Sequence, residues 1–257
     1  MDDIRNLLNE WPYDAARCVR KIVGSDGRER LQARTPMGIE QYELEGRPDG
    51  VRPHGCESAL AYAEEQIDRR AAETGAPHSF ELDEELAAEL QHEGLIYYYR
   101  YLVCFQIGEY ELVARDTARN LRMFDVLQAH CSDEGTVHSS TQYRPYLLRM
   151  NAAARSLLAV GRTEYGTAKR IIREALETIR ELEPVPTDTF EYEKERSLAI
   201  LRGMLRAIPK DKPLTAEDLL RRELHEAVAA ENYERAAQIR DRLRGLAAGR
   251  GRRAGQA

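Results

Sequence analysis

Cysteine is scarce in this chain, which carries only Cys18, Cys56, Cys104 and Cys131 among 257 residues. The four lie far apart and form no CxxC pair, which argues against a zinc ribbon or a redox dithiol. No secretory signal precedes them, so we expect reduced thiols. Cys18 and Cys56 are expected to pack as small apolar side chains.

Long apolar runs and an excess of basic residues are also missing. No run approaches the roughly 20 residues that span a bilayer. The acidic N-terminus MDDIRNLLNEW lacks the basic region of a signal peptide. The formal net charge is −6, whereas proteins that coat nucleic acids are rich in Lys and Arg. We therefore expect a cytoplasmic protein with no membrane partner.

Catalytic motifs are absent too. There is no GxSxG, Walker A loop, HExxH or GxGxxG in a supporting context. His130, Cys131 and His138 could ligate zinc, but they lack a clear fourth ligand. We therefore predict a protein that is not an enzyme and binds no metal or other cofactor.

One acidic cluster could nevertheless form a metal or nuclease-like site. It comprises Glu40, Glu43, Glu45 and Asp49, with Lys21 and His54 nearby. On a strand, residues two apart share a face, so Glu43 and Glu45 point together while Glu40 points away. Because strand edges commonly carry such charges as protection against pairing, we predict solvated charges here.

Strand-like patterns are confined to the N-terminal part of the chain. Residues 2–10 form a short amphipathic pattern with Ile4, Leu7 and Leu8 inward, ended by Trp11-Pro12. The runs CVRKIVG, RERLQAR and GIEQYELEG then contain β-branched and aromatic residues and are separated by turn signals. They predict a three-stranded antiparallel meander, with Asp26-Gly27 as a tight turn.

Helical patterns fill the rest of the chain. The many Ala, Leu, Glu and Arg residues favour helices, and strands are expected only within about residues 17–45. A polar loop is predicted at Ser132–Thr136. The predicted helices are Glu57–Thr74, Leu82–Ile107, Tyr110–Cys131, Tyr143–Val160, Tyr165–Leu182 and Phe190–Ile208.

Pairs of helices joined by short turns suggest helical-hairpin repeats. Gly161, Tyr165, Ala168 and Ala175-Leu176 resemble the second half of a tetratricopeptide repeat, and Gly108, Tyr110, Val113 and Leu121 form a weaker copy. Neither has the first-helix signature, so an irregular α-helical bundle is the alternative. The tyrosines between Tyr97 and Tyr101 predict core packing, with a peptide-binding groove as the alternative.

The most specific pattern lies near the C-terminus. Leu220, Leu224, Ala227 and Val228 share one helical face, residues 231–234 form a turn, and Ala236 to Leu246 form a second helix. Paired alanines allow the two helices to approach closely. The core YExAAxxRD resembles the UVR motif of the excision-repair proteins UvrB and UvrC and of some Clp chaperone subunits. Leu224 and Val228 stand where the repair proteins often have methionine and alanine.

The resemblance implies a hairpin that binds a partner protein, often a second copy of the same hairpin, and has no chemistry of its own. Pro209 and Pro213 separate it from the preceding helix, and Thr215 can cap its first helix. The implied partner-binding residues are Leu220, Leu224, Tyr233, Glu234, Ala236, Ala237, Arg240, Asp241 and Leu243.

The last residues form the one basic region. Six arginines and a single acid, Asp241, give Arg240 to Ala257 a charge of +5. Arg250, Arg252 and Arg253 lie in a Gly- and Ala-rich stretch that predicts disorder and could contact nucleic-acid phosphates.

The sequence thus predicts a mainly α protein in four parts. They are an N-terminal helix and β-meander (1–52), tetratricopeptide-like helical hairpins (53–208), a UVR hairpin (209–247) and a basic tail (248–257). We predict an interaction scaffold or adaptor that docks through the hairpin, in excision repair or Clp-type protein quality control. The alternatives are a nucleic-acid-associated accessory protein that uses the arginine tail, and an enzyme with its site in the meander.

Overall fold

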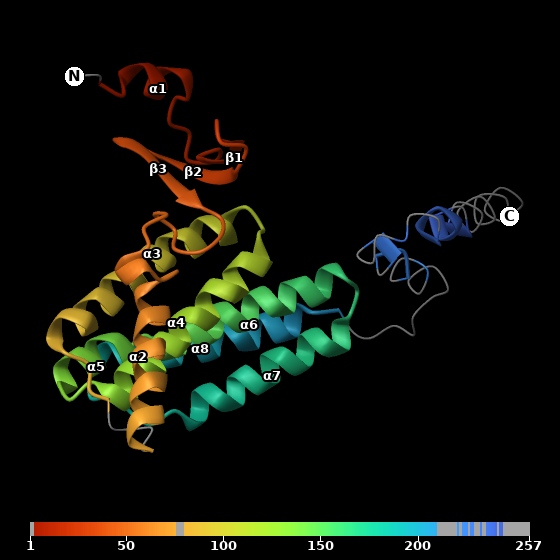
Figure 1. Ribbon diagram of the computed structural model, residues 1–257. Coiled ribbons are helices and arrows are strands. Elements are labelled where there is room, and N and C mark those ends of the chain that lie inside the picture. Colours follow the sequence, from red (N-terminus) through yellow and green to blue (C-terminus); the bar gives the residue numbers. More distant parts are fainter. Residues whose placement is uncertain are drawn as a thin grey trace, which may run out of the picture.

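The computed structural model describes residues 3–75 and 80–209, and in the C-terminal segment residues 220, 223–225, 227–228, 232, 235–240 and 242–243. In Figure 1 a small antiparallel sheet lies at one end of a body of helices. The predicted mainly α fold with a three-stranded N-terminal sheet is confirmed. Within the described residues, the strands fall inside the predicted range 17–45.

The sheet is a meander of β1 (Val19–Val23), β2 (Glu29–Thr35) and β3 (Gly38–Glu43). Val19 pairs with Ala33 across the first ladder, and Arg30 pairs with Glu43 across the second. Leu31, Ala33 and Tyr42 are buried and belong to the same apolar cluster as residues of the following helices. One face of the sheet is therefore part of the main core.

The predicted Asp26-Gly27 turn joins β1 to β2. Gly27 has φ of 77°, a backbone conformation that costs glycine little and other residues more. The Asp26 carboxylate accepts two hydrogen bonds of 2.7 Å from Arg30. These contacts fix the register of the hairpin.

The N-terminal helix differs from the prediction. Helix α1 spans Arg5–Glu10 and has no buried residue, and Ile4 and Leu7 are about half exposed. The predicted inward packing of Ile4 and Leu7 is therefore wrong. The sheet instead contacts Trp11, the residue after this helix. Arg34 Nε donates to the Trp11 carbonyl at 2.8 Å, and the Arg20 guanidinium lies 4.1 Å from the centroid of the Trp11 ring.

The first group of long helices follows the short 3₁₀ turn η1 (Pro53–Gly55). It comprises α2 (Ala59–Thr74), α3 (Glu84–Gln106) and α4 (Tyr110–His130). Ser58 caps α2 and Asp83 caps α3 through side-chain acceptors, as these residue types favour. Their buried apolar side chains complete the core shared with the sheet, which includes Leu60, Leu90, Val113 and Leu127.

A short helix occupies part of the predicted polar loop at Ser132–Thr136. Helix α5 spans Glu134–Thr141, and the Asp133 carboxylate caps it by accepting from the Thr136 N–H at 2.8 Å. The loop prediction is therefore wrong from Glu134 onward. The segment has few strong helix formers, and the capping hydrogen bond offsets this weak propensity.

The second group of helices comprises α6 (Arg144–Gly161), α7 (Tyr165–Glu181) and α8 (Asp188–Ala207). Their core contains Ile172, Ile179 and Leu201, each fully buried. Ala168 on α7 is fully buried, and its carbonyl accepts from Ser156 Oγ on α6 at 3.4 Å. A small side chain at this position therefore allows close approach, as the helical-hairpin pattern predicts. The tetratricopeptide-like interpretation itself stays a prediction.

The tyrosines of α3 divide as their helical positions predict. Tyr97 and Tyr101 are buried, Tyr98 is half-buried and Tyr99 is about half exposed. The Tyr97 ring lies 4.9 Å from the Arg100 guanidinium and 4.3 Å from that of Arg119. Core packing is therefore the role of Tyr97 and Tyr101.

Candidate functional site

The C-terminal hairpin has a small apolar cluster of its own. Leu220, Ala227, Ala236 and Ile239 are buried in it, and Leu224 and Leu243 pack against it half-buried. Two of the four buried side chains are alanines, which bury little area. A cluster of this size contributes little stability compared with the core of a domain.

Asn232 joins the two halves of this hairpin. Its N–H donates to the Ala227 carbonyl at 2.8 Å, which closes the first helical segment. Its side-chain oxygen accepts from the Arg235 N–H at 3.1 Å, and its carbonyl accepts from the Ala236 N–H at 3.0 Å. Asn232 therefore acts as the N-cap of the second segment, a role that asparagine favours.

The predicted partner-binding residues fall into two groups. Leu220, Leu224, Ala236 and Leu243 pack within the cluster of the hairpin, and Ala237 is half-buried. Arg240 is exposed, and so is Val228, an apolar residue that is 50% exposed. Tyr233, Glu234 and Asp241, like Pro213, Thr215 and the tail arginines Arg250, Arg252 and Arg253, lie outside the described residues.

The acids of the meander, the second candidate site, are held in ion pairs and hydrogen bonds with basic or hydroxyl partners. Glu43 pairs with Arg30 at 2.5 Å, and Glu45 pairs with Arg115 at 3.0 Å. The other pairs are Asp49 with Arg47, His54 with Glu89, Lys21 with Glu109, and Glu40 with the Tyr42 hydroxyl.

The candidate zinc ligands His130, Cys131 and His138 do not form a metal-binding cluster within the described residues. His130 Nδ1 lies 2.9 Å from the Phe80 carbonyl. Across residues 3–75 and 80–209 and the described part of the hairpin, no three His, Cys, Asp or Glu side chains converge where a metal ion could bind.

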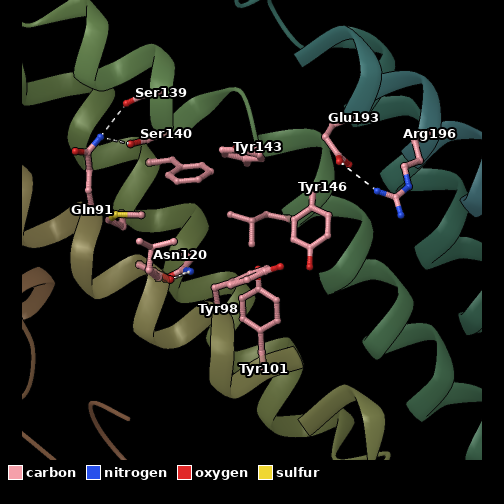
Figure 2. A pocket seen from close by; sticks show the side chains of 15 residues that line it. Gln91, Tyr98, Tyr101, Asn120, Ser139, Ser140, Tyr143, Tyr146, Glu193 and Arg196 are labelled. Atoms are coloured by element: carbon pink, nitrogen blue, oxygen red, sulfur yellow. Dashed lines mark hydrogen bonds and ion pairs between the residues drawn. The ribbon is translucent and has the colours of Figure 1, made fainter. Parts of the chain in front are cut away.

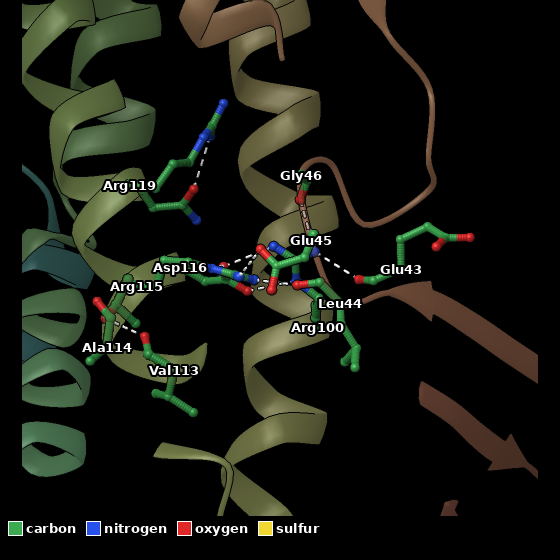
Figure 3. Close-up of polar contacts among 12 residues, drawn as sticks. Glu43, Leu44, Glu45, Gly46, Arg100, Val113, Ala114, Arg115, Asp116 and Arg119 are labelled. Atoms are coloured by element: carbon green, nitrogen blue, oxygen red, sulfur yellow. Dashed lines mark hydrogen bonds and ion pairs between the residues drawn. The ribbon is translucent and has the colours of Figure 1, made fainter. Parts of the chain in front are cut away.

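A buried ion pair connects the sheet to the helices (Figure 3). Arg100 on α3 and Asp116 on α4 are fully buried and form two hydrogen bonds, of 2.7 and 2.8 Å. Arg100 Nη1 also donates to the carbonyls of Glu43 and Gly46, at 2.8 and 2.9 Å. The loop after β3 is thereby fixed to the helices.

A second buried carboxylate, Glu93, holds the start of α2. It accepts from the Ala59 and Leu60 N–H groups at 2.7 and 3.2 Å. It also pairs with Arg47 at 3.4 Å and with Arg119. A carboxylate that bonds free N–H groups at a helix N-terminus and two guanidiniums is well compensated in a buried setting.

These two clusters were not predicted from the sequence, although a signal for them exists. Leu86, Leu90, Glu93, Tyr97, Arg100 and Cys104 follow one another at alternating steps of four and three residues. That spacing places the two charged residues on the buried stripe of α3. The pairing of Glu93 and Arg100 with opposite charges indicates a role in holding the fold.

The four cysteines differ in how deeply they are buried. Burial raises the pKa of the Cys104 thiol to about 12, whereas Cys18, Cys56 and Cys131 are partly exposed. Since the thiolate is the reactive form, Cys104 is inert in the folded protein. Cys18 and Cys56, which we expected to pack as small apolar side chains, are half-buried and are not enclosed in the core.

We predict that Cys18, Cys56 and Cys131 react with a disulfide reagent in the native protein and that Cys104 reacts only after unfolding. A time course of reagent consumption with and without denaturant measures this. Equal reaction rates for all four thiols in the native protein would contradict the buried position of Cys104.

Comparison with known proteins identifies one region of the chain. The family model for the UvrB/uvrC motif matches residues 218–248, so the chain carries a UVR motif where the resemblance placed it. No curated protein and no solved structure matches the chain. Within the described residues, no helix has the length and apolar character needed to cross a membrane.

Proposed function

We propose that this chain is a non-enzymatic adaptor that docks onto a partner protein through its C-terminal UVR hairpin. The observation that supports the proposal is the motif match at residues 218–248. The partner is a second copy of the hairpin or another protein. In the latter case it belongs to excision repair or to Clp-type protein quality control.

The small core of the hairpin supports a docking role. Short helical hairpins are marginal in water, and most helical stability comes from packing against something else. The described cluster contains residues of the hairpin alone. A partner that covers the exposed side at Val228 would supply further apolar burial.

The helical body supports the role of a scaffold. The sheet and the helices α2–α4 share one core, and buried ion pairs fix the loop between them. A rigid body of this kind holds its shape while a terminal module engages a partner. The pairing of the meander acids with basic or hydroxyl partners favours this role over catalysis.

We predict that Val228→Glu abolishes partner capture or self-association. A buried, unpaired carboxylate at an apolar interface costs several kcal/mol, which corresponds to a loss of at least about a hundredfold in affinity. Immobilised protein is incubated with extract of the native cell, and the captured chains are compared by mass spectrometry. Self-association is followed by sedimentation.

The matched control is Val51→Glu, since Val51 is 52% exposed and lies in the loop before α2. It makes the same substitution on the body and should leave capture unchanged. If Val228→Glu captures the same chains as the wild type and associates equally, docking through this face is wrong.

A further inference from the structure

A pocket of about 560 Å³ lies among α3, α4, α5, α6 and α8, away from the hairpin and the meander. Its volume is in the range of sites that hold small organic molecules. Figure 2 shows aromatic side chains from α3 and α6 facing its interior. The apolar lining includes Leu95, Tyr98, Phe124, Tyr143, Tyr146 and Leu147.

One carboxylate in the lining has an unused acceptor. The Glu193 side chain on α8 is nine-tenths buried, and its Oε1 accepts from Arg196 Nη1 at 3.4 Å. No described residue donates a hydrogen bond to its Oε2. The nearest guanidinium nitrogen to that atom, Arg149 Nη2, lies 3.7 Å away, beyond hydrogen-bond distance.

Several other polar groups of the lining already have partners. Gln91 Nε2 donates to Ser139 and Ser140 Oγ at 3.0 and 2.9 Å. Asn120 Nδ2 donates to the Gly94 carbonyl at 2.9 Å. Among the described residues of the lining, Glu193 Oε2 is the buried polar atom without a hydrogen-bond partner, and a ligand donor would satisfy it.

The charge around Glu193 indicates the kind of donor that fits. Two guanidiniums, those of Arg149 and Arg196, flank this single carboxylate. A ligand cation would add a third positive charge, which is unfavourable in a partly buried site. A neutral N–H or O–H group satisfies the oxygen without that cost, and hydrogen bonds to a charged acceptor are stronger than neutral ones.

We propose that this pocket binds a small aromatic molecule that carries one neutral N–H or O–H donor, of the indole or phenol class. Its ring lies against Tyr98, Tyr146 and Phe124, and its donor bonds Glu193 Oε2. Aromatic rings pair favourably in offset or edge-to-face arrangements, which a pocket with several tyrosines provides. The site is independent of the UVR hairpin and of its partner.

The probe pair is indole and 1-methylindole, which share a ring but differ in the N–H. Titration calorimetry on the full chain should show indole binding at least about tenfold more tightly, as expected for one hydrogen bond to a charged acceptor. Glu193→Gln should reduce that ratio toward one. Glu195→Gln, an exposed neighbour on α8, should leave it unchanged.

Two further arms keep the test decisive. Leu95→Trp places a larger ring at the rim, where Leu95 is exposed, so it should weaken both probes even if the Glu193 variant is unstable. A short peptide containing tryptophan tests a protein side chain as the ligand. Equal affinity of the two indoles, no binding of either, or binding of the peptide alone would overturn the proposal.

Discussion

Replacing Asp116 with alanine is expected to destabilise the protein by about 3–5 kcal/mol, because breaking a buried ion pair leaves an uncompensated charge. Arg100 is fully buried, and Asp116 supplies two of its hydrogen bonds. Its remaining bonds, to the carbonyls of Glu43 and Gly46, cannot neutralise the guanidinium. Urea denaturation followed by circular dichroism measures the change in the free energy of unfolding.

Asp125→Ala is the matched control, since Asp125 lies on the same helix and also pairs with an arginine. The ion pair of Asp125 with Arg144 has a similar distance, 2.7 Å, but the Asp125 side chain is 64% exposed. Exposed pairs contribute at most about 1 kcal/mol. If both variants lose the same small stability, Arg100 is not held by Asp116 as described.

Glu93→Ala is expected to have an effect of similar size, about 3–5 kcal/mol, for a related reason. The substitution removes one of the carboxylate partners of Arg47, the carboxylate that pairs with Arg119, and the acceptor of two N–H groups at the start of α2. The first turn of α2 should therefore loosen. Hydrogen exchange at the Ala59 and Leu60 amides should accelerate more than exchange in α7.

His92→Ala is the control for this variant, because His92 is the exposed neighbour of Glu93 on α3. Surface substitutions of this kind usually change stability by no more than about 0.5 kcal/mol. A Glu93→Ala protein with unchanged exchange at Ala59 and Leu60 would show that the carboxylate does not hold the start of α2.

Much of the fold follows from local patterns. The Asp26-Gly27 turn and the flanking runs predict the meander because turn chemistry and strand propensity act over a few residues. The long helices are predicted for a similar reason, since their apolar periodicity extends over several turns. The boundaries of α3, α4, α6, α7 and α8 lie within two residues of the predicted ones.

Other features depend on distant residues and could not be predicted. Helix α5 contains few strong helix formers. The pattern over residues 2–10 is amphipathic, although Ile4 and Leu7 are about half exposed and lie outside the core. The pairing of Arg100 with Asp116 joins two helices, and the sequence alone does not say which acid meets which base. The ion pairs of the meander acids Glu43 and Glu45 also join residues that are distant in the sequence, so the sequence alone does not predict them.

The UVR hairpin and the pocket beside Glu193 differ in how far the sequence predicts them. The hairpin is recognisable from a short motif because its helices meet across a few residues, and the motif match at 218–248 confirms it. The pocket beside Glu193 draws on five helices, so no local spacing marks it. The tyrosine cluster of α3 indicates a groove only in part, since Tyr97 and Tyr101 are buried while Tyr98 lines the pocket.

The most direct test of the account compares the full chain with a chain that ends at Lys212. If the hairpin is a docking module on an independent body, the shortened protein keeps the melting temperature of the body but loses self-association and partner capture. Thermal unfolding by circular dichroism and sedimentation of the same two samples give both answers. A shortened protein that unfolds, or one that still associates and captures the same partners, would contradict the central claim.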